Sequence, residues 1–306
     1  MRLGFFLPQL GPAASPESIV RVAKRAEDLG YDSVWVTERL LFPIAPQTPY
    51  AGTPDGSLPD VYKISFDPIE TLTYVAARTQ RIALGTSVLV MPYYNPVVLA
   101  RRLTTLDVLS GGRLRVGLGL GWSKDEHDAT GASMKGRGRL ADEFLDVLKA
   151  IWTADPVEFK GKFFQVPKSI IQPKPVQQPH PPVYLAAFTP RGLKRAATKA
   201  NGWHPVGMPV EAMQQMAGGM RAMAKEAGRD PNELEIVVRA NFLLSPEPLG
   251  DDRFIYMGSE DQLKQDIKAT RDLGADELIF DPTFSPAGES LDGFLSSLEK
   301  IKGLAA

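Results

Sequence analysis

Apolar stretches alternate with amphipathic stretches along most of the chain. The clearest case spans residues 81–122, where an apolar run at 81–90 is followed by a helical pattern through 103–110 and a second apolar run at 113–122. Strands of a parallel sheet are buried on both faces, so they appear in a sequence as nearly continuous apolar runs. This stretch therefore predicts a strand–helix–strand unit and an α/β architecture.

The same alternation continues towards both ends of the chain. Helices begin and end at ordinary capping signals, as where Ser15 and Pro16 begin the first helix and Gly30 ends it. Strands are predicted at residues 1–7, 31–36, 81–90, 113–122, 183–187, 202–206, 235–244 and 277–280. Eight strands alternating with helices, without an internal change of composition, predict one (β/α)8 TIM barrel domain over residues 1–306.

Three insertions interrupt this alternation. Residues 38–66 follow the second strand and contain five prolines, residues 123–138 follow the fourth strand, and residues 157–182 precede the fifth. The last of these combines a predicted hairpin with a proline-rich linker. Barrel active sites lie at the carboxyl ends of the strands, so we expect the first two insertions to shape a substrate site. The alternative for residues 38–66 is a surface loop without a role.

Composition narrows the possible chemistry. The chain has no cysteine, which excludes disulfides, thiolate metal ligands and a cysteine nucleophile. Its net charge of −1 lacks the positive field that nucleic-acid binding uses, and no segment reaches the roughly 18 apolar residues of a membrane span. We therefore expect a cytoplasmic protein whose partner is a small-molecule substrate, with neither nucleic acid nor a membrane as a partner.

The predicted strand ends offer few classical catalytic groups. The three histidines, His127, His180 and His204, lack metal-site spacing, and no Gly-x-Ser-x-Gly elbow marks a nucleophile. We expect His127 to be a loop residue and His180 to be structural, whereas His204 falls in a strand and could face either way. No metal site is predicted, and such a barrel is expected to obtain its reactivity from an organic cofactor.

The run from Gly117 to Gly121 places glycine at every second position at the end of the fourth strand. It lacks the Gly-x-Gly-x-x-Gly spacing of a dinucleotide-binding turn. Two interpretations stay open. The glycines either allow close backbone packing at a corner of the barrel, or they allow the backbone to approach a planar ring.

A set of motifs in residues 67–122 carries a family resemblance. The motifs are Asp67-Pro68-x-Glu70, Arg81-Ile-x-Leu-Gly-Thr-Ser-Val88, Pro96, Leu106-Asp107-x-Leu-Ser-Gly-Gly-Arg113 and Gly117-x-Gly-x-Gly-Trp122. Together they resemble the luciferase-like monooxygenase family, in particular its members that use the deazaflavin coenzyme F420. Weaker similarity continues over most of the chain, and the family fold is the barrel that the pattern of strands predicts.

The resemblance implies where a cofactor binds. It implies a cis peptide between Ser87 and Val88 behind the deazaflavin ring, and a phosphate site on the backbone of the turn before the fifth helix. A weaker alternative for the phosphate is the turn at Gly258 and Ser259. The cofactor-binding residues implied in this way are Glu38, Ser87, Val88, Leu120, Gly121, Trp122, Asp125, Ala187, Phe188 and Thr189.

Departures from the family pattern define the candidate catalytic residues. F420-dependent sugar-phosphate dehydrogenases have an acidic residue followed by a histidine after the second strand, where this chain has Glu38 and Arg39. Arginine cannot act as a base near neutral pH. Arg39 would instead orient an anionic or carbonyl substrate, or pair with Glu38 or another carboxylate. Leu120 and Trp122 replace a threonine and a glutamate, which predicts a more apolar pocket.

The resemblance implies an F420-dependent oxidoreductase that transfers a hydride between the deazaflavin C5 and a small, largely apolar organic substrate. One alternative is a two-component monooxygenase that uses reduced FMN from a separate reductase. Another is a non-catalytic flavin-binding or storage protein, which the absence of a recognisable base leaves open. By resemblance we also expect a homodimer built on helices of the first half of the chain.

Overall fold

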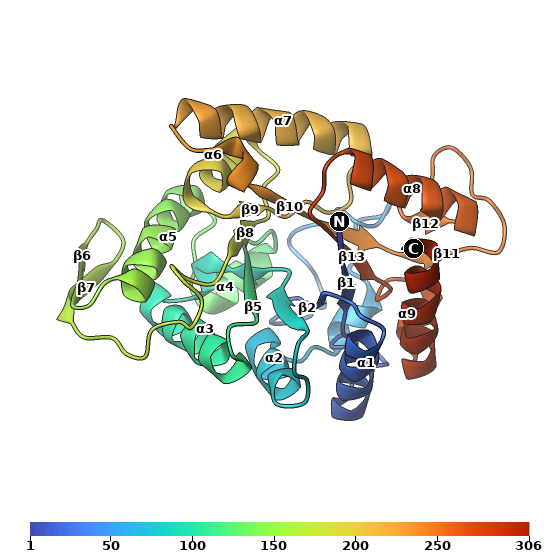
Figure 1. Ribbon diagram of the computed structural model, residues 1–306, viewed down its shortest axis with the longest axis horizontal. Coiled ribbons are helices and arrows are strands. Elements are labelled where there is room, and N and C mark those ends of the chain that lie inside the picture. The colour runs from blue at the N-terminus through green and yellow to red at the C-terminus, as the bar shows by residue number, and fades with distance from the viewer. Residues whose placement is uncertain (306) are drawn as a thin grey trace.

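Eight parallel strands close into a barrel in the computed structural model, which describes residues 1–305 (Figure 1). Each strand pairs with the next along the chain, and pairing of the eighth with the first closes the ring. The strands are β1 (Arg2–Phe6), β2 (Ser33–Val36), β3 (Ala83–Thr86), β5 (Leu114–Gly119), β8 (Val183–Leu185), β9 (Gly202–Trp203), β10 (Glu235–Asn241) and β13 (Glu277–Asp281). The predicted (β/α)8 barrel is confirmed.

The helices surround the barrel and begin at the capping signals that the sequence predicts. Ser15 and Asp67 each accept hydrogen bonds from backbone amides of the first turn, and a proline follows each of them. Ser259 forms a capping box with Gln262. The surrounding helices are α1 (Pro16–Asp28), α2 (Pro68–Ala76), α3 (Pro96–Ser110), α5 (Arg137–Thr153), α6 (Pro190–Lys199), α7 (Val210–Glu226), α8 (Glu260–Asp272) and α9 (Leu291–Ala305).

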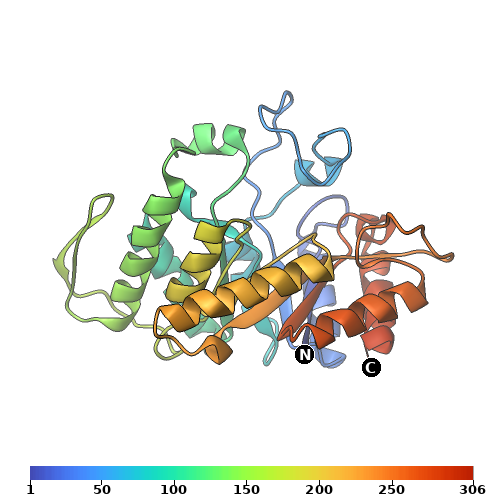
Figure 2. The same ribbon diagram turned by 90° about the horizontal axis from the view of Figure 1, so that it is seen from above.

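The three insertions occur where they are predicted. In Figure 2 residues 38–66, which include the 3-10 helix η1 (Asp60–Lys63), rise above the same end of the barrel as α4 (Lys124–Thr130). The hairpin of β6 (Val157–Lys160) and β7 (Gln165–Ser169) projects from the side of the barrel in both views. The shorter elements are β4 (Leu89–Val90), η2 (Met91–Tyr93), η3 (Pro231–Glu233), β11 (Leu243–Leu244), β12 (Met257–Gly258) and η4 (Pro286–Glu289).

The insertion at 123–138 contains a short helix, α4, which the pattern of apolar positions does not predict. Ser123 caps its amino end and Gly131, in a left-handed conformation, ends it after seven residues. A helix this short presents no apolar repeat in the sequence, so only its two caps could have indicated it. This corrects the expectation for His127, which lies on α4 and is fully buried instead of lying in a loop.

The barrel interior and the layer between barrel and helices form two separate cores. Neighbouring strand residues point to opposite faces, so Phe5 packs outwards against the helices while Phe6 points into the barrel. Phe6 and Trp35 belong to the interior cluster, which also contains Tyr184, Val237 and Ile279.

None of the helices in residues 1–305 has the length and apolarity needed to cross a membrane.

The amino end of the barrel interior is polar. The Glu277 carboxylate is fully buried and accepts hydrogen bonds from Arg2 Nε at 3.2 Å and from the Trp35 indole at 3.1 Å. Arg115 and the Ser33 hydroxyl contact the same carboxylate. Because four donors converge on one buried anion, this network ties β1, β2 and β5 to β13.

The glycines of β5 allow close packing inside the barrel. A side chain at Gly117 would collide with the carbonyl oxygen of Thr86, and a Cβ at Gly119 would lie 2.6 Å from Val88 Cγ2. The packing interpretation of the glycine run therefore holds at these two positions. Gly121, where φ is +70°, is packed closely as well, because a Cβ there would lie 2.7 Å from Val90 Cγ1 and 2.8 Å from His127 Cε1. Close approach of this backbone to a cofactor ring stays a prediction.

Gly117→Ala is expected to lower the free energy of unfolding by about 1–3 kcal/mol, because the barrel has no room for the added methyl group. Gly218→Ala is the matched control, since Gly218 lies within α7 and a Cβ there meets nothing within 4 Å. The control is expected to gain up to about 1 kcal/mol. Urea unfolding measures both, and equal stabilities of the two variants would contradict the packing argument.

Candidate active site

The candidate active site lies at the carboxyl ends of the barrel strands, below residues 38–66 and α4 (Figure 2). Glu38 and Arg39 leave β2 directly and are both buried, with 8% of each residue exposed. Burying a charged side chain is costly unless hydrogen bonds or opposite charges compensate it. The partners of these two residues therefore define what the site can do.

Glu38 is a buried carboxyl group with few compensating donors. It accepts a hydrogen bond from the Val90 amide at 2.6 Å and another from the Tyr94 hydroxyl. Burial raises the pKa of Glu38 to about 7, the nearby charges of Asp67 and Glu126 add to the rise, and the two hydrogen bonds oppose it. Glu38 can consequently hold or release a proton near neutral pH.

Arg39 pairs with Glu126 and not with Glu38. Its Nε lies 3.3 Å from Glu126 Oε1, and both side chains are only 4% exposed. The guanidinium carbon lies 5.0 Å from the ring centre of Tyr62 and 4.7 Å from that of Trp122. A cation against aromatic faces in a dry site is attracted by them. Of the two roles predicted for Arg39, pairing with another carboxylate is confirmed, and orienting a substrate stays open.

The predicted cis peptide between Ser87 and Val88 is present. Ser87 Oγ lies 2.7 Å from His204 Nε2, and His204 Nδ1 lies 2.6 Å from the Val237 carbonyl oxygen. Burial lowers the pKa of His204 to about 4, so the ring is neutral. Its Nδ1–H donates a hydrogen bond to the carbonyl, and Nε2 accepts a hydrogen bond from the Ser87 hydroxyl. His204 therefore faces the barrel interior, where it stacks on Trp35 with ring centres 5.4 Å apart.

Trp122 connects the strand end to the segment above the site. It follows Leu120 and Gly121 and lies against Arg39. The ring of Tyr50 also packs against Trp122, with ring centres 5.3 Å apart. Tyr50 in turn shares a hydrogen bond of 3.1 Å with Tyr62. Trp122, Tyr50 and Tyr62 thus form an aromatic cluster beside Arg39, and the apolar pocket stays a prediction.

Asp125 binds the segment above the site. Its carboxylate accepts the Gln47 amide at 3.0 Å and the Gln47 side chain at 3.2 Å. The Lys124 amide donates to Thr48 Oγ1 at 3.1 Å, so residues 47 and 48 are attached to the first turn of α4. Both oxygens of Asp125 are used in this way, and its assignment to the cofactor stays a prediction.

The predicted phosphate turn follows β8. Ala187 is buried and its carbonyl accepts the Trp203 indole at 2.8 Å, whereas Phe188 is 54% exposed. Thr189 caps α6 by accepting the Gly192 amide at 3.2 Å. The turn therefore lies at a helix amino end, which favours an anion. The alternative turn at Ser259 caps α8 in the same manner.

Buried polar atoms without a hydrogen-bond partner gather at this end of the barrel. Within residues 1–305 they are Arg39 Nε and Nη2, Ser65 Oγ, His127 Nε2 and Asn241 Oδ1. Ser65 belongs to the segment above the site, His127 to α4, and Asn241 ends β10. Sequence reasoning missed these last three. For Asn241 a polar residue within the apolar run 235–244 was the available signal, and for the other two there was none.

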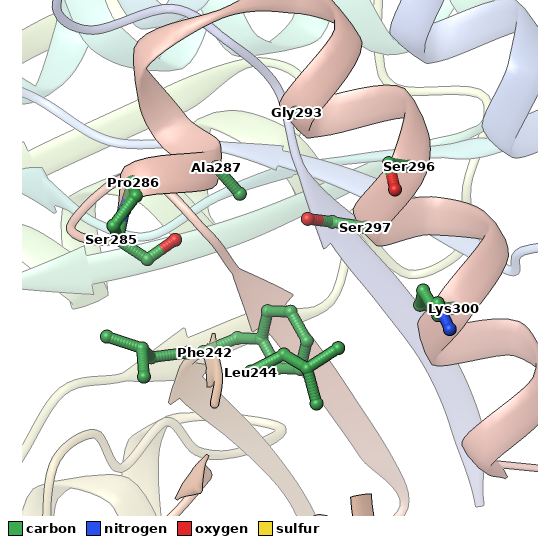
Figure 3. A pocket seen from close by; sticks show the side chains of 10 residues that line it. Phe242, Leu244, Ser285, Pro286, Ala287, Gly293, Ser296, Ser297 and Lys300 are labelled. Carbon is green, nitrogen blue, oxygen red and sulfur yellow. The ribbon is translucent and has the colours of Figure 1, made fainter. Parts of the chain in front are cut away.

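A separate hollow lies between the segment after β10 and α9 (Figure 3). It has a volume of about 240 Å³ and is lined by residues that include Leu244, Ser285, Ser297 and Lys300. The ammonium group of Lys300 already lies 3.4 Å from Glu260. This hollow contains none of the predicted site residues, and none of the unpartnered polar atoms lines it.

Comparison with known proteins identifies relatives. A sequence model of luciferase-like monooxygenases matches residues 1–248. An uncharacterised protein of Mycobacterium tuberculosis is 38% identical over 183 residues, which span 59% of this chain and 64% of that protein. The F420-dependent glucose-6-phosphate dehydrogenase of Amycolatopsis mediterranei is 34% identical over 61% of this chain and 53% of its own length. The matches thus span less than two thirds of these relatives.

Another relative is named as flavin-dependent. The oxygenase component of the flavin-dependent trigonelline monooxygenase of Acinetobacter baylyi is 32% identical over 58% of this chain and 50% of that protein. Among solved structures, monooxygenase RslO1 of Streptomyces bottropensis superposes with a TM-score of 0.80 at 23% identity, covering 99% and 98% of the two chains. An F420-dependent secondary alcohol dehydrogenase gives 0.78 at 19% identity, covering 100% and 99%. These structures share the fold of this chain.

Proposed function

Because the chain belongs to the luciferase-like monooxygenase family, we propose that it is an F420-dependent oxidoreductase acting on a small, largely apolar organic substrate. The observation that carries the proposal is the group of unpartnered buried polar atoms at the carboxyl end of the barrel. Native proteins pair nearly all such atoms with protein groups or ordered water, so exceptions on the segments at this end of the barrel support a bound ligand there. The homodimer and the small-molecule partner implied by the resemblance are part of this proposal.

The residues at this end of the barrel suit a ring bearing carbonyl and amide groups. Trp122 and the backbone of Leu120 and Gly121 would line one side of the ring, and Ser87 and Val88 would support it from behind. The backbone from Ala187 to Thr189, which includes Phe188, would bind the phosphate at the amino end of α6. Bound F420 would supply a carbon that gives or receives a hydride.

The chain itself would manage protons and water. Glu38, whose pKa is raised to about 7, would hold the proton that accompanies hydride transfer to a carbonyl or alkene. Tyr50, Tyr62 and Trp122 would exclude water above the site. Arg39 would orient the substrate, since it is the buried cation beside these rings.

A two-component monooxygenase that uses reduced FMN is the second candidate. It is supported by the 32% identity to the oxygenase component of trigonelline monooxygenase. The F420 proposal is preferred because the motifs at 81–88 and 117–122 resemble F420-dependent members. The F420-dependent glucose-6-phosphate dehydrogenase is also slightly more similar in sequence, at 34% identity.

Titration of the purified protein with F420 and with FMN, each oxidised and reduced, tests the proposal through cofactor fluorescence and absorbance. We expect saturable binding of F420 at least 10-fold tighter than that of FMN. Trp122→Ala is expected to weaken F420 binding about 10-fold or more by removing a stacking partner, in line with 1–3 kcal/mol per aromatic contact.

Phe163→Ala is the matched control, because this aromatic side chain is 41% exposed in the hairpin turn and distant in sequence from every site residue. It should bind F420 like the unmodified protein. Tighter binding of FMN would favour the two-component monooxygenase over the F420-dependent oxidoreductase. Binding of neither cofactor would reject both candidate functions.

A further inference from the structure

The guanidinium group of Arg39 has unused hydrogen-bonding capacity. Its side chain is 4% exposed, and Nε and Nη2 are buried without a hydrogen-bond partner among residues 1–305. Arginine carries five N–H donors and keeps its charge at every physiological pH. Burying a guanidinium with two nitrogens that make no hydrogen bond costs free energy unless a ligand binds them.

Glu126 balances the charge of Arg39 without using its donors. One Glu126 oxygen accepts the Leu40 amide at 2.8 Å, and the other accepts the Tyr93 hydroxyl at 3.2 Å. Arg39 Nε lies 3.3 Å from the first of these oxygens, but the pair does not align as a hydrogen bond. Glu126 is therefore held by its own donors, and Nε and Nη2 remain available to a ligand.

The unused nitrogens define the shape of the ligand group. Nε and Nη2 form one edge of the guanidinium, and two parallel donors on an edge match the two oxygens of a planar carboxylate. The rings of Tyr62 and Trp122, at 5.0 and 4.7 Å from the guanidinium carbon, restrict the orientation of this edge. They also offer an apolar surface to the body of the same ligand.

The charges around Arg39 favour a monoanion. Glu126 lies 3.3 Å from Arg39 Nε and Glu38 is the preceding residue, whereas Arg239, which donates to the Ser87 carbonyl at 3.2 Å, is already bound to Asp281 at 2.5 Å. A doubly charged phosphate would meet one cation, whose charge Glu126 already balances, and two acidic side chains. A carboxylate carries one charge, and it meets less repulsion still when Glu38 holds its proton.

We infer that Arg39 binds a carboxylate of the substrate through Nε and Nη2, which makes the substrate a small carboxylic acid with an apolar body. That this ligand is the substrate rests on the proposed function, but the anion site itself does not depend on the cofactor. Since both nitrogens are buried beside Tyr62 and Trp122, the ligand enters when these rings shift, and Trp122 emission should change on binding.

Benzoate and its neutral isostere benzamide are suitable probes, titrated against the cofactor-free protein by calorimetry and tryptophan fluorescence. We expect saturable benzoate binding, with benzamide at least 10-fold weaker. In Arg39→Met the benzoate affinity should fall about 10- to 100-fold, as for loss of charge-assisted hydrogen bonds, and the preference over benzamide should disappear. Arg39→Lys should lie between the two, because it keeps the charge but lacks the paired donors.

Arg195→Met is the matched control. Arg195 is also buried and ion-paired, with Nε 2.6 Å from Asp142, but it lies on α6 and its partner on α5. It should keep the benzoate preference. Circular dichroism and thermal melting report the folding of each variant, and Arg39→Lys decides the matter if Arg39→Met does not fold.

Three results would overturn the inference: no saturable benzoate binding, equal binding of benzoate and benzamide, or an unchanged preference in a folded Arg39 variant. The cofactor titration separates this failure from that of the proposed function. A benzoate preference without F420 or FMN binding leaves the anion site standing and rejects the proposed function. Cofactor binding without a benzoate preference does the reverse.

Discussion

Glu277→Ala is expected to lower the free energy of unfolding by about 3–5 kcal/mol. The Glu277 carboxylate is fully buried at the amino end of the barrel, where Arg2 and Arg115 both bind it. Without it, the Arg115 guanidinium would remain in the barrel interior with no carboxylate at that position, and the Trp35 indole would lose one of its two acceptors. Equilibrium unfolding in urea, followed by circular dichroism, measures the loss.

Glu299→Ala is the matched control for this prediction. Glu299 also accepts a hydrogen bond from an arginine, Arg25, at 2.6 Å, but its side chain is 57% exposed on α9. Exposed ion pairs contribute about 0–1 kcal/mol, so this variant should change stability little. If both variants lost the same amount of stability, the buried network would not hold the barrel strands together as argued.

The stability of the protein relative to Glu38→Gln is expected to fall by about 3 kcal/mol as pH rises from 4.5 to above 7. Burial raises the pKa of Glu38 to about 7 from its ordinary 4.5, so the folded protein holds a proton that the unfolded chain has released. The contribution of Glu38 is fully present below pH 4.5 and is lost as pH rises through 7. Urea unfolding of both proteins at several pH values between 4.5 and 8.5 measures it.

Tyr94→Phe tests the cause of this dependence. The Tyr94 hydroxyl donates to the Glu38 carboxylate and thereby lowers its pKa. Without that hydroxyl the pKa of Glu38 should rise further, and the loss of stability should extend to higher pH. Parallel stability curves for the unmodified protein and Glu38→Gln would show that Glu38 does not titrate in this range, and would remove it as a proton carrier.

The sequence by itself determined the barrel. Each strand is a local apolar run, and each helix end has a local cap such as Ser15 or Asp67, so the number and order of the elements follow from neighbouring residues. The insertions were found in the same way, from breaks in that periodicity. The cis peptide at Ser87 and Val88 was implied by the family resemblance of a contiguous motif.

Only the tertiary structure decided which side chains of the site meet. Ser87 and His204 are 117 residues apart and lie within hydrogen-bond distance, while Arg39 pairs with Glu126 and not with its neighbour Glu38. Asp125 binds Gln47, which lies 78 residues away along the chain. Such pairings depend on how the insertions pass over the barrel and on the direction of each side chain there, and no periodic pattern of apolar residues encodes either of them.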